Sequence, residues 1–302
     1  MTDTAASQAG AKKEKAAKEE KEGKKAKKDK FAHLNVEEGT LRHGLPYRAL
    51  GTGDEPLVVL RWFTDNHTNP EGWERNVELK QLAPLAERYR VYAVNRAPGM
   101  AKGTTMEQIA EQHAEALTEK FGGPVHILGT SSGGSVALQL AADHPQVFRR
   151  MVLAMAGHTM GDEARAAQLK YAEACEAGRR ALHHTARISF KSAALAKVVA
   201  PLMWLVDPFV RPKEPSDMVA FVRAEAAYDV RDRLGEIRVP TLVIAGGQDP
   251  ACPPEVCRRT ADGMPDAELV VYEKAGHIGT FNNPQFPKDV LAFLGGGSPG
   301  RG

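Results

Sequence analysis

A serine set between two glycines is the first candidate for chemistry in this chain of 302 residues. In the pentapeptide GTSSG, Gly129 and Gly133 stand two residues on either side of Ser131. Glycine at both positions permits a turn too tight for side chains, and such a turn exposes the Ser131 hydroxyl as a nucleophile. Ser132 is a poorer candidate, because its upstream flank at the same offset is not glycine.

Two further residues supply the partners that a serine nucleophile needs, a base and an acid that orients the base. Asp249 closely follows the apolar run 241–245 (TLVIA), and His277 closely follows 269–272 (LVVY). If both runs are parallel strands, both side chains lie at carboxyl ends of strands, where open α/β sheets build their sites. Singly, the aspartate reads as a turn residue and the histidine as a packed one. Together with Ser131 they predict a nucleophile, its orienting acid and its general base.

The elements that must position these residues are strands alternating with helices. The GTSSG turn follows the apolar run VHIL and opens an Ala/Leu-rich helical pattern, which is the strand–turn–helix setting of an exposed serine. The sequence predicts a short strand pair within 39–50, strands over 57–60, 91–94, 125–128, 151–154, 241–245 and 269–272, and helices ending at Tyr89, beginning at Thr105, and over 134–144 and 289–294. This alternation is typical of a parallel sheet covered by helices on both faces.

One segment breaks the alternation. Between 161 and 234 only helical patterns occur, with an apolar stretch at 198–210 (VVAPLMWLVDPFV). We interpret this segment as a helical cap or lid over the ends of the strands. The predicted fold class is therefore α/β, a mostly parallel doubly wound sheet with a helical insertion, in which residues 31–160 and 235–294 form the core and 161–234 the cap.

Both ends of the chain read as tails. Residues 1–30 are rich in Lys, Glu and Ala, with 10 Lys against 6 acids, and residues 295–302 are rich in Gly. The first segment is either a tether for nucleic acid or an anionic membrane, or a solvated tail without a specific partner. Interspersed glutamates and the lack of an aromatic stacking platform favour the solvated tail and argue against a specific nucleic-acid partner.

Composition excludes several classes of protein. No run approaches the roughly 20 apolar residues of a membrane helix, which argues against an integral membrane protein. The first 30 residues contain no apolar stretch of a secretory signal. The three cysteines match neither a disulfide framework nor a zinc motif, and we predict a cytoplasmic location with free thiols; the alternative is a disulfide between Cys252 and Cys257. His183-His184 lacks a carboxylate cluster, and we predict no metal or other cofactor. The oligomeric state is not predicted.

The chain resembles the α/β-hydrolase superfamily over roughly 41–294. The resemblance is carried by VHILGTSSGGSVALQLAADHPQVFRRMVLA, PTLVIAGGQDPACPPE and AGHIGTFNNP. It implies Ser131 as nucleophile, His277 as general base and then acid, and Asp249 as the acid that orients the imidazole. It also implies an oxyanion hole formed by the backbone N–H groups of Ser132 and Phe63.

The sequence departs from the family after the run 57–60. Many relatives have His-Gly there, whereas this chain has Arg61-Trp62-Phe63. We interpret Arg61 as a residue that holds the loop by hydrogen bonds; the alternative is that it meets a substrate carboxylate. Arg96, after the run 91–94, is interpreted as structural.

The leading functional interpretation is a serine hydrolase that cleaves a small or medium acyl compound, most simply a carboxylic ester. The substrate-binding candidates are Trp62, Met203 and Trp204, which would contribute to an apolar acyl pocket. Resemblance to the family leaves open acyl transfer, perhydrolysis and carbon–carbon hydrolysis. A ligand-binding protein on the same scaffold, with little turnover, is the alternative from another class.

Overall fold

The computed structural model describes residues 30–297. The two tails predicted from composition, 1–30 and 295–302, therefore lie outside the described residues, except for Lys30 and residues 295–297.

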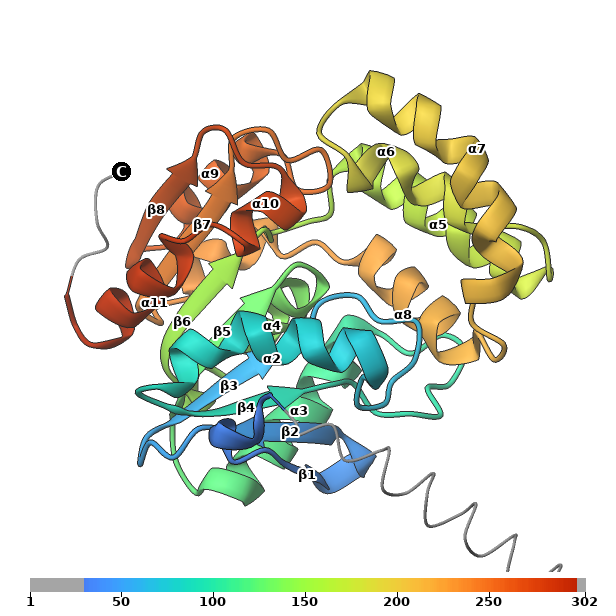
Figure 1. The fold of residues 1–302 in the computed structure, drawn as a ribbon. Coiled ribbons are helices and arrows are strands. Elements are labelled where there is room, and N and C mark those ends of the chain that lie inside the picture. The colour runs from blue at the N-terminus through green and yellow to red at the C-terminus, as the bar shows by residue number, and fades with distance from the viewer. Residues whose placement is uncertain (1–29, 298–302) are drawn as a thin grey trace, which may run out of the picture.

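An eight-stranded sheet forms the centre of the molecule, in the order β1-β2-β4-β3-β5-β6-β7-β8 (Figure 1). The pairs β1–β2 and β2–β4 are antiparallel, and every other neighbouring pair is parallel. The strands are β1 (Glu37–Thr40), β2 (Pro46–Leu50), β3 (Pro56–Leu60), β4 (Arg90–Val94), β5 (Val125–Thr130), β6 (Phe148–Ala154), β7 (Thr241–Gly246) and β8 (Ala267–Tyr272).

Side chains alternate between the two faces of the sheet along each strand, and on each face the central strands pack against helices. In β3, Val58 and Leu60 join one hydrophobic cluster, which also contains residues of α3 (Met106–Phe121), α4 (Ser132–Asp143) and α9 (Pro254–Gly263). Leu57 and Val59 join the other, with residues of α2 (Gly72–Ala86) and α11 (Phe286–Leu294). The predicted α/β class with a doubly wound, mostly parallel sheet is confirmed.

Local sequence signals explain several element boundaries. Helix α3 begins after Thr105, whose side chain accepts the backbone N–H of Gln108 while the Gln108 side chain accepts the N–H of Thr105, and these two hydrogen bonds form a capping box. The strand pair β1–β2 turns at His43 and Gly44, both at positive φ. Helix α9 and the short α10 (His277–Phe281) were not predicted from the sequence.

Between β6 and β7 the chain forms helices that lie beyond the end of the sheet (Figure 1). They are α5 (Asp162–Glu176), η4 (Leu182–Thr185), α6 (Ala186–Ser189), α7 (Ala193–Val210) and α8 (Ser216–Ala227), and we call them the cap. The last helix before β7, η5 (Arg231–Glu236), packs instead against α4 and α9 of the core. The cap is tied to the loop after β4, because the Asp217 carboxylate accepts the backbone N–H groups of Gly99 and Met100 at 2.9 and 2.8 Å.

One cap helix bears on the expectation about membranes. By length and composition alone, α7 is apolar enough to cross a bilayer, with a mean hydropathy of 1.6, and only 11% of it is buried. The sequence prediction counted no such run because Lys197 and Asp207 interrupt it. Length and composition are weak evidence of a span, and both ends of α7 continue into other cap helices.

Candidate active site

The GTSSG turn joins β5 to α4 and holds Ser131 in a strained backbone conformation, with φ at 52° and ψ at −125°. Its N–H donates to the carbonyl of Ala154 at 2.8 Å, which ties the turn to the end of β6. A Cβ atom on Gly133 would lie 2.1 Å from the carbonyl oxygen of Leu60, and one on Gly129 would lie 2.7 Å from the Cα of Gly134. The two glycines are therefore required by close backbone approach, as the sequence predicts.

The three candidate residues meet at the carboxyl ends of β5, β7 and β8. Ser131 Oγ lies 2.9 Å from His277 Nε2, and His277 Nδ1 lies 2.7 Å from Asp249 Oδ2. Asp249 is buried, and its other oxygen accepts the backbone N–H groups of Ala251 and Cys252 at 2.8 and 3.1 Å. The carboxylate is thus fixed against the imidazole, and this arrangement can pass the serine proton to His277.

The residues assigned to an oxyanion hole lie on either side of the turn. Ser132 is the first residue of α4, where backbone N–H groups have no partner within the helix. The close approach of Gly133 to Leu60 brings the loop that carries Trp62 and Phe63 against the turn. The Trp62 ring packs edge-on against Phe281 in α10, with ring centroids 5.5 Å apart. The roles of Trp62, Phe63 and Ser132 stay predictions.

Arg61 is fully buried and bound to protein groups. Its Nε donates to Glu78 at 2.5 Å, and its Nη1 donates to Asn69 Oδ1 at 2.9 Å. Burial lowers the pKa of Arg61, which the adjacent Glu78 carboxylate opposes. Arg48 donates to the same carboxylate from β2. These contacts favour the loop-holding interpretation of Arg61 over contact with a substrate.

Arg96 is also buried and structural in its contacts. It donates through Nε to His67 Nε2 at 3.1 Å, and its guanidinium lies 4.0 Å from the ring centroid of Phe221 in α8. Burial lowers the pKa of Arg96 to about 10. Burial, followed by the positive charge of Arg96, lowers the pKa of His67 to about 4, so His67 is neutral at pH 7.

A residue that sequence reasoning missed lies directly beside the turn. Glu225 in α8 is buried and accepts hydrogen bonds from Ser132 Oγ and Ser135 Oγ, both at 2.9 Å. Burial raises the pKa of its carboxyl, whereas the two hydroxyls, Arg96 and His277 oppose the rise. An isolated glutamate in an Ala-rich helical pattern looks like a surface residue, so the sequence held no signal for this contact.

The other two substrate-binding candidates lie on α7, which packs against η4 and α6. Trp204 is about half exposed and lines a cavity within the cap that no triad residue lines. Met203 is half-buried on the same helix. The structure does not bring Trp204 to the triad, because the indole faces Arg180, whose guanidinium lies 3.8 Å from the ring centroid.

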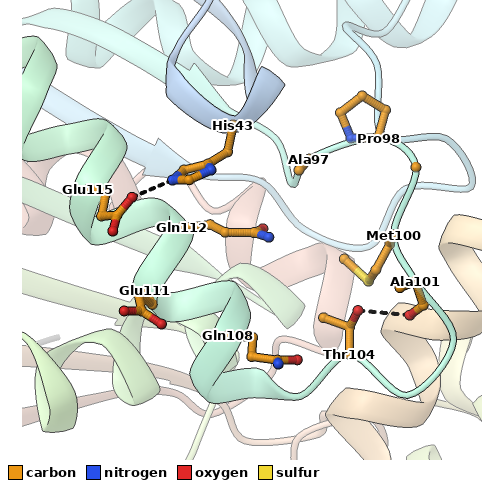
Figure 2. A pocket seen from close by; sticks show the side chains of 11 residues that line it. His43, Ala97, Pro98, Met100, Ala101, Thr104, Gln108, Glu111, Gln112 and Glu115 are labelled. Carbon is orange, nitrogen blue, oxygen red and sulfur yellow. Dashed lines mark hydrogen bonds and ion pairs between the residues drawn. The ribbon is translucent and has the colours of Figure 1, made fainter.

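A further hollow of about 590 Å³ lies between the loop after β4, the turn at His43 and α3 (Figure 2). Its polar wall includes Glu111 and Glu115, and Glu115 lies 2.6 Å from His43 Nε2. None of the triad residues lines it. We assign it no catalytic role.

Within residues 30–297, no group of three or more His, Cys, Asp and Glu side chains could hold a metal ion. The rings of His183 and His184 stack with centroids 4.0 Å apart. Cys175, Cys252 and Cys257 are free, and the Sγ atoms of Cys252 and Cys257 lie 3.2 Å apart.

Comparison with known proteins bears on the fold and the family of the chain. The model of the alpha/beta hydrolase family matches residues 43–292. A 2-hydroxy-6-oxononadienedioate/2-hydroxy-6-oxononatrienedioate hydrolase of Cupriavidus pinatubonensis is 29% identical over 87% of this chain and 94% of its own length. Two solved structures share the fold. The alpha/beta hydrolase MGS-M2 from a Medee basin deep-sea metagenome library has a TM-score of 0.69 and 20% identity, and the match covers 86% of this chain and 97% of that one. An esterase from Exiguobacterium antarcticum has a TM-score of 0.64 and 20% identity, and the match covers 85% of this chain and 99% of that one. With a triad-like arrangement on this sheet and a family match over most of its length, the chain belongs to the alpha/beta hydrolase family.

Proposed function

We propose that the protein is a serine hydrolase that cleaves a small or medium acyl compound, most simply a carboxylic ester. The observation that carries the proposal is the continuous contact from Ser131 Oγ through His277 to the buried Asp249 carboxylate. An isolated serine hydroxyl is a weak nucleophile, and an adjacent imidazole oriented by a carboxylate is what activates it.

In the proposed reaction Ser131 Oγ attacks the ester carbonyl while His277 Nε2 takes its proton. The tetrahedral oxyanion accepts hydrogen bonds from the N–H groups of Ser132 and Phe63, each worth about 3 kcal/mol in the transition state. The carbon–oxygen bond breaks, and the alcohol leaves with the proton held by His277. Water then attacks the acyl-enzyme while His277 takes one of its protons. The bond from the acyl carbon to Ser131 Oγ breaks, His277 returns the proton to Oγ, and the carboxylic acid is released.

A second candidate is hydrolysis of a carbon–carbon bond in a 2-hydroxy-6-oxo dienedioate, which the name of the Cupriavidus relative suggests. A dianionic substrate calls for a cationic group in the pocket. Arg61 and Arg96 are both buried and hydrogen-bonded to protein groups, which supports a neutral ester as the substrate instead. A non-catalytic binding protein is the third possibility for this scaffold.

The first experiment is labelling with a fluorophosphonate probe, read by intact mass. We expect one adduct on the native chain, none on Ser131→Ala, and an adduct on Ser132→Ala, which removes the neighbouring hydroxyl as a matched control. Absence of an adduct on the folded native chain would contradict an activated serine and favour the binding protein.

A substrate panel then separates ester from carbon–carbon cleavage. We expect p-nitrophenyl esters of short and medium acyl chains to be hydrolysed with a kcat/KM that Ser131→Ala abolishes. Faster decay of the chromophore of a 2-hydroxy-6-oxo dienedioate than of any ester would replace the ester proposal with the second candidate.

A further inference from the structure

Helix α7 leaves an apolar surface uncovered on the cap. Of its 18 residues only Ala196 and Asp207 are buried. Phe209 and Val198 are 87% and 75% exposed, and the other exposed large apolar side chains of the helix are Leu195, Leu202, Trp204, Leu205, Val206 and Val210. In Figure 1 the helix lies at the outer edge of the cap. A large exposed apolar surface of this kind marks an interaction site.

The charge around α7 is almost entirely positive. Residues 177–213 contain seven Lys and Arg and one acid, Asp207, whereas the rest of the body, 31–176 and 214–302, contains 23 Lys and Arg against 31 acids. Asp207 is turned inward, where its Oδ1 accepts the backbone N–H groups of Ala181 and Leu182 at 2.8 and 2.7 Å. Glu163 on α5 pairs with Arg187 at 3.0 Å and Asp207 lies 4.0 Å from Arg211, so acids offset two of the seven cations and the segment keeps a net positive charge.

A cationic cavity of about 640 Å³ opens beside Trp204. Arg180 forms part of its wall, donating through Nη1 to the carbonyls of Trp204 and Leu205 at 2.5 and 3.1 Å. Burial lowers the pKa of His184, and electrostatic repulsion within the cavity lowers it further, whereas the Asp207 carboxylate opposes the shift. The lining includes Arg179, Arg180, His183, His184, Trp204 and Arg211, which is the chemistry of an anion site.

We propose that the exposed apolar side chains of α7 and this cavity form a docking surface for a bilayer that contains anionic phospholipids. The apolar side chains enter the boundary between headgroups and acyl chains, and the arginines face the phosphates. The helix lies in the plane of the interface. It does not cross the bilayer, because Arg211 at its carboxyl end donates to the carbonyls of Gly178 and Arg179 at 2.6 and 3.0 Å and keeps that end on the cap.

Charge decides against the other occupants. In a twofold dimer formed through α7, the seven cations of residues 177–213 in one copy would face the same seven cations in the other copy and repel them. The chain's own residues 1–30, with 10 Lys against 6 acids, have the same sign. An anionic bilayer complements both the apolar surface and the positive charge.

The test is co-sedimentation of the full chain with vesicles of phosphatidylcholine alone and with about one-third phosphatidylglycerol. We expect binding to the anionic vesicles only. Replacing Val198 and Phe209 together by Ser should lower the partition coefficient about tenfold or more, because both side chains enter the bilayer. Arg179→Gln should lower it about fivefold, the effect of one cation near an anionic surface.

Three controls locate the contact. Trp73→Ser removes an aromatic side chain from α2 of the core whose exposed fraction, 73%, is close to that of Val198. This variant should bind vesicles as the native chain does. Lipids brominated in their acyl chains should quench tryptophan emission of the native chain, and Trp204→Phe should remove most of that quenching. None of these readouts needs turnover, so Ser131→Ala should bind normally and a failed hydrolase proposal leaves this one standing.

Two results would overturn the proposal. One is equal binding by the native chain and the Val198→Ser/Phe209→Ser variant. The other is a dimer, seen by light scattering without lipid, that Phe209→Ser converts to a monomer, because a second copy would then cover α7.

Discussion

At the scale of single residues, the site combines a strained nucleophile with a fully satisfied acid. Ser131 holds a positive φ that costs of order 1–3 kcal/mol in a residue other than glycine, and hydrogen bonds from the turn to β6 and within α4 retain it there. Both carboxylate oxygens of Asp249 are hydrogen-bonded, one to two backbone N–H groups and the other to His277 Nδ1. The serine is thereby presented to the imidazole in one geometry.

Glu225 should make stability depend on pH. Burial raises the pKa of its carboxyl above the ordinary 4.5, so the folded state binds the proton more tightly than the unfolded chain. Its contribution to stability is complete below pH 4.5 and is lost as the pH rises through the raised pKa. Glu225→Gln keeps the hydrogen bonds without the ionisation. We expect the native chain to lose free energy of unfolding relative to Glu225→Gln as the pH rises above 4.5, measured by urea titration. Parallel pH profiles of the two proteins would contradict a raised pKa.

At the scale of elements, one buried carboxylate joins helix α2 to two strands of the sheet. Glu78 in α2 accepts from Arg48 in β2 and from Arg61 at the end of β3. Each arginine is also bound to a further acceptor, the Pro70 carbonyl for Arg48 and Asn69 for Arg61. The loop that carries the predicted oxyanion donor Phe63 therefore starts from a fixed point.

Removing that carboxylate should be costly. Glu78→Gln leaves the buried Arg61 guanidinium without a carboxylate partner, whereas Arg48 keeps its ion pair with Glu38 at 2.7 Å. We expect a loss of about 3–5 kcal/mol in the free energy of unfolding. The matched control is Glu176→Gln, which breaks the exposed pair with Arg223 at 2.6 Å and should leave stability nearly unchanged. Similar small losses in both variants would show that the buried cluster is not required.

The start of α4 gives a second prediction about how elements meet. A Cβ on Gly134 would lie 2.2 Å from the Cβ of Ala156, in the loop after β6. Gly134→Ala should therefore destabilise the fold by about 1–3 kcal/mol through overpacking. Adding Ala156→Gly removes the clashing methyl group and should restore most of the loss, measured by urea unfolding of both single variants and the double variant. If the two single variants' losses in free energy of unfolding simply add in the double variant, the cost of Gly134→Ala does not come from the contact with Ala156.

At the scale of the whole molecule, charge is unevenly divided between cap and core. The cations concentrate in 177–213, whereas the core carries an excess of acids. Asp217 and Glu225 hold the cap to the core beside the triad. An anionic surface therefore attracts the cap and repels the rest of the molecule, which carries negative charge, so the molecule is oriented with its cap toward that surface.

The lysine-rich segment should be passive by comparison. Deleting residues 1–29 removes a net positive charge but no described contact of the fold. We expect ester hydrolysis to be unchanged and vesicle binding to keep its dependence on Phe209. If the deletion instead abolishes vesicle binding, the tether interpretation of the segment replaces docking by the cap.

The sequence by itself determined the sheet, the turn and the order of the candidate triad. Two-residue alternation and apolar runs predict strands from local information, and only glycine permits the close approaches at 129 and 133. Placing Asp249 and His277 needed only the rule that sites form at carboxyl ends of parallel strands.

Only the tertiary structure decided which neighbours the remaining polar and apolar residues find. Glu78 and Glu225 are charged residues on helices, and nothing local distinguishes them from surface glutamates until β2, β3 and α4 pack against them. Helix α7 is apolar on nearly every side, so its periodicity does not define a buried face. The sequence therefore predicts that its side chains avoid water, but the cap packing alone turns Trp204 to Arg180 and Phe209 to the outside.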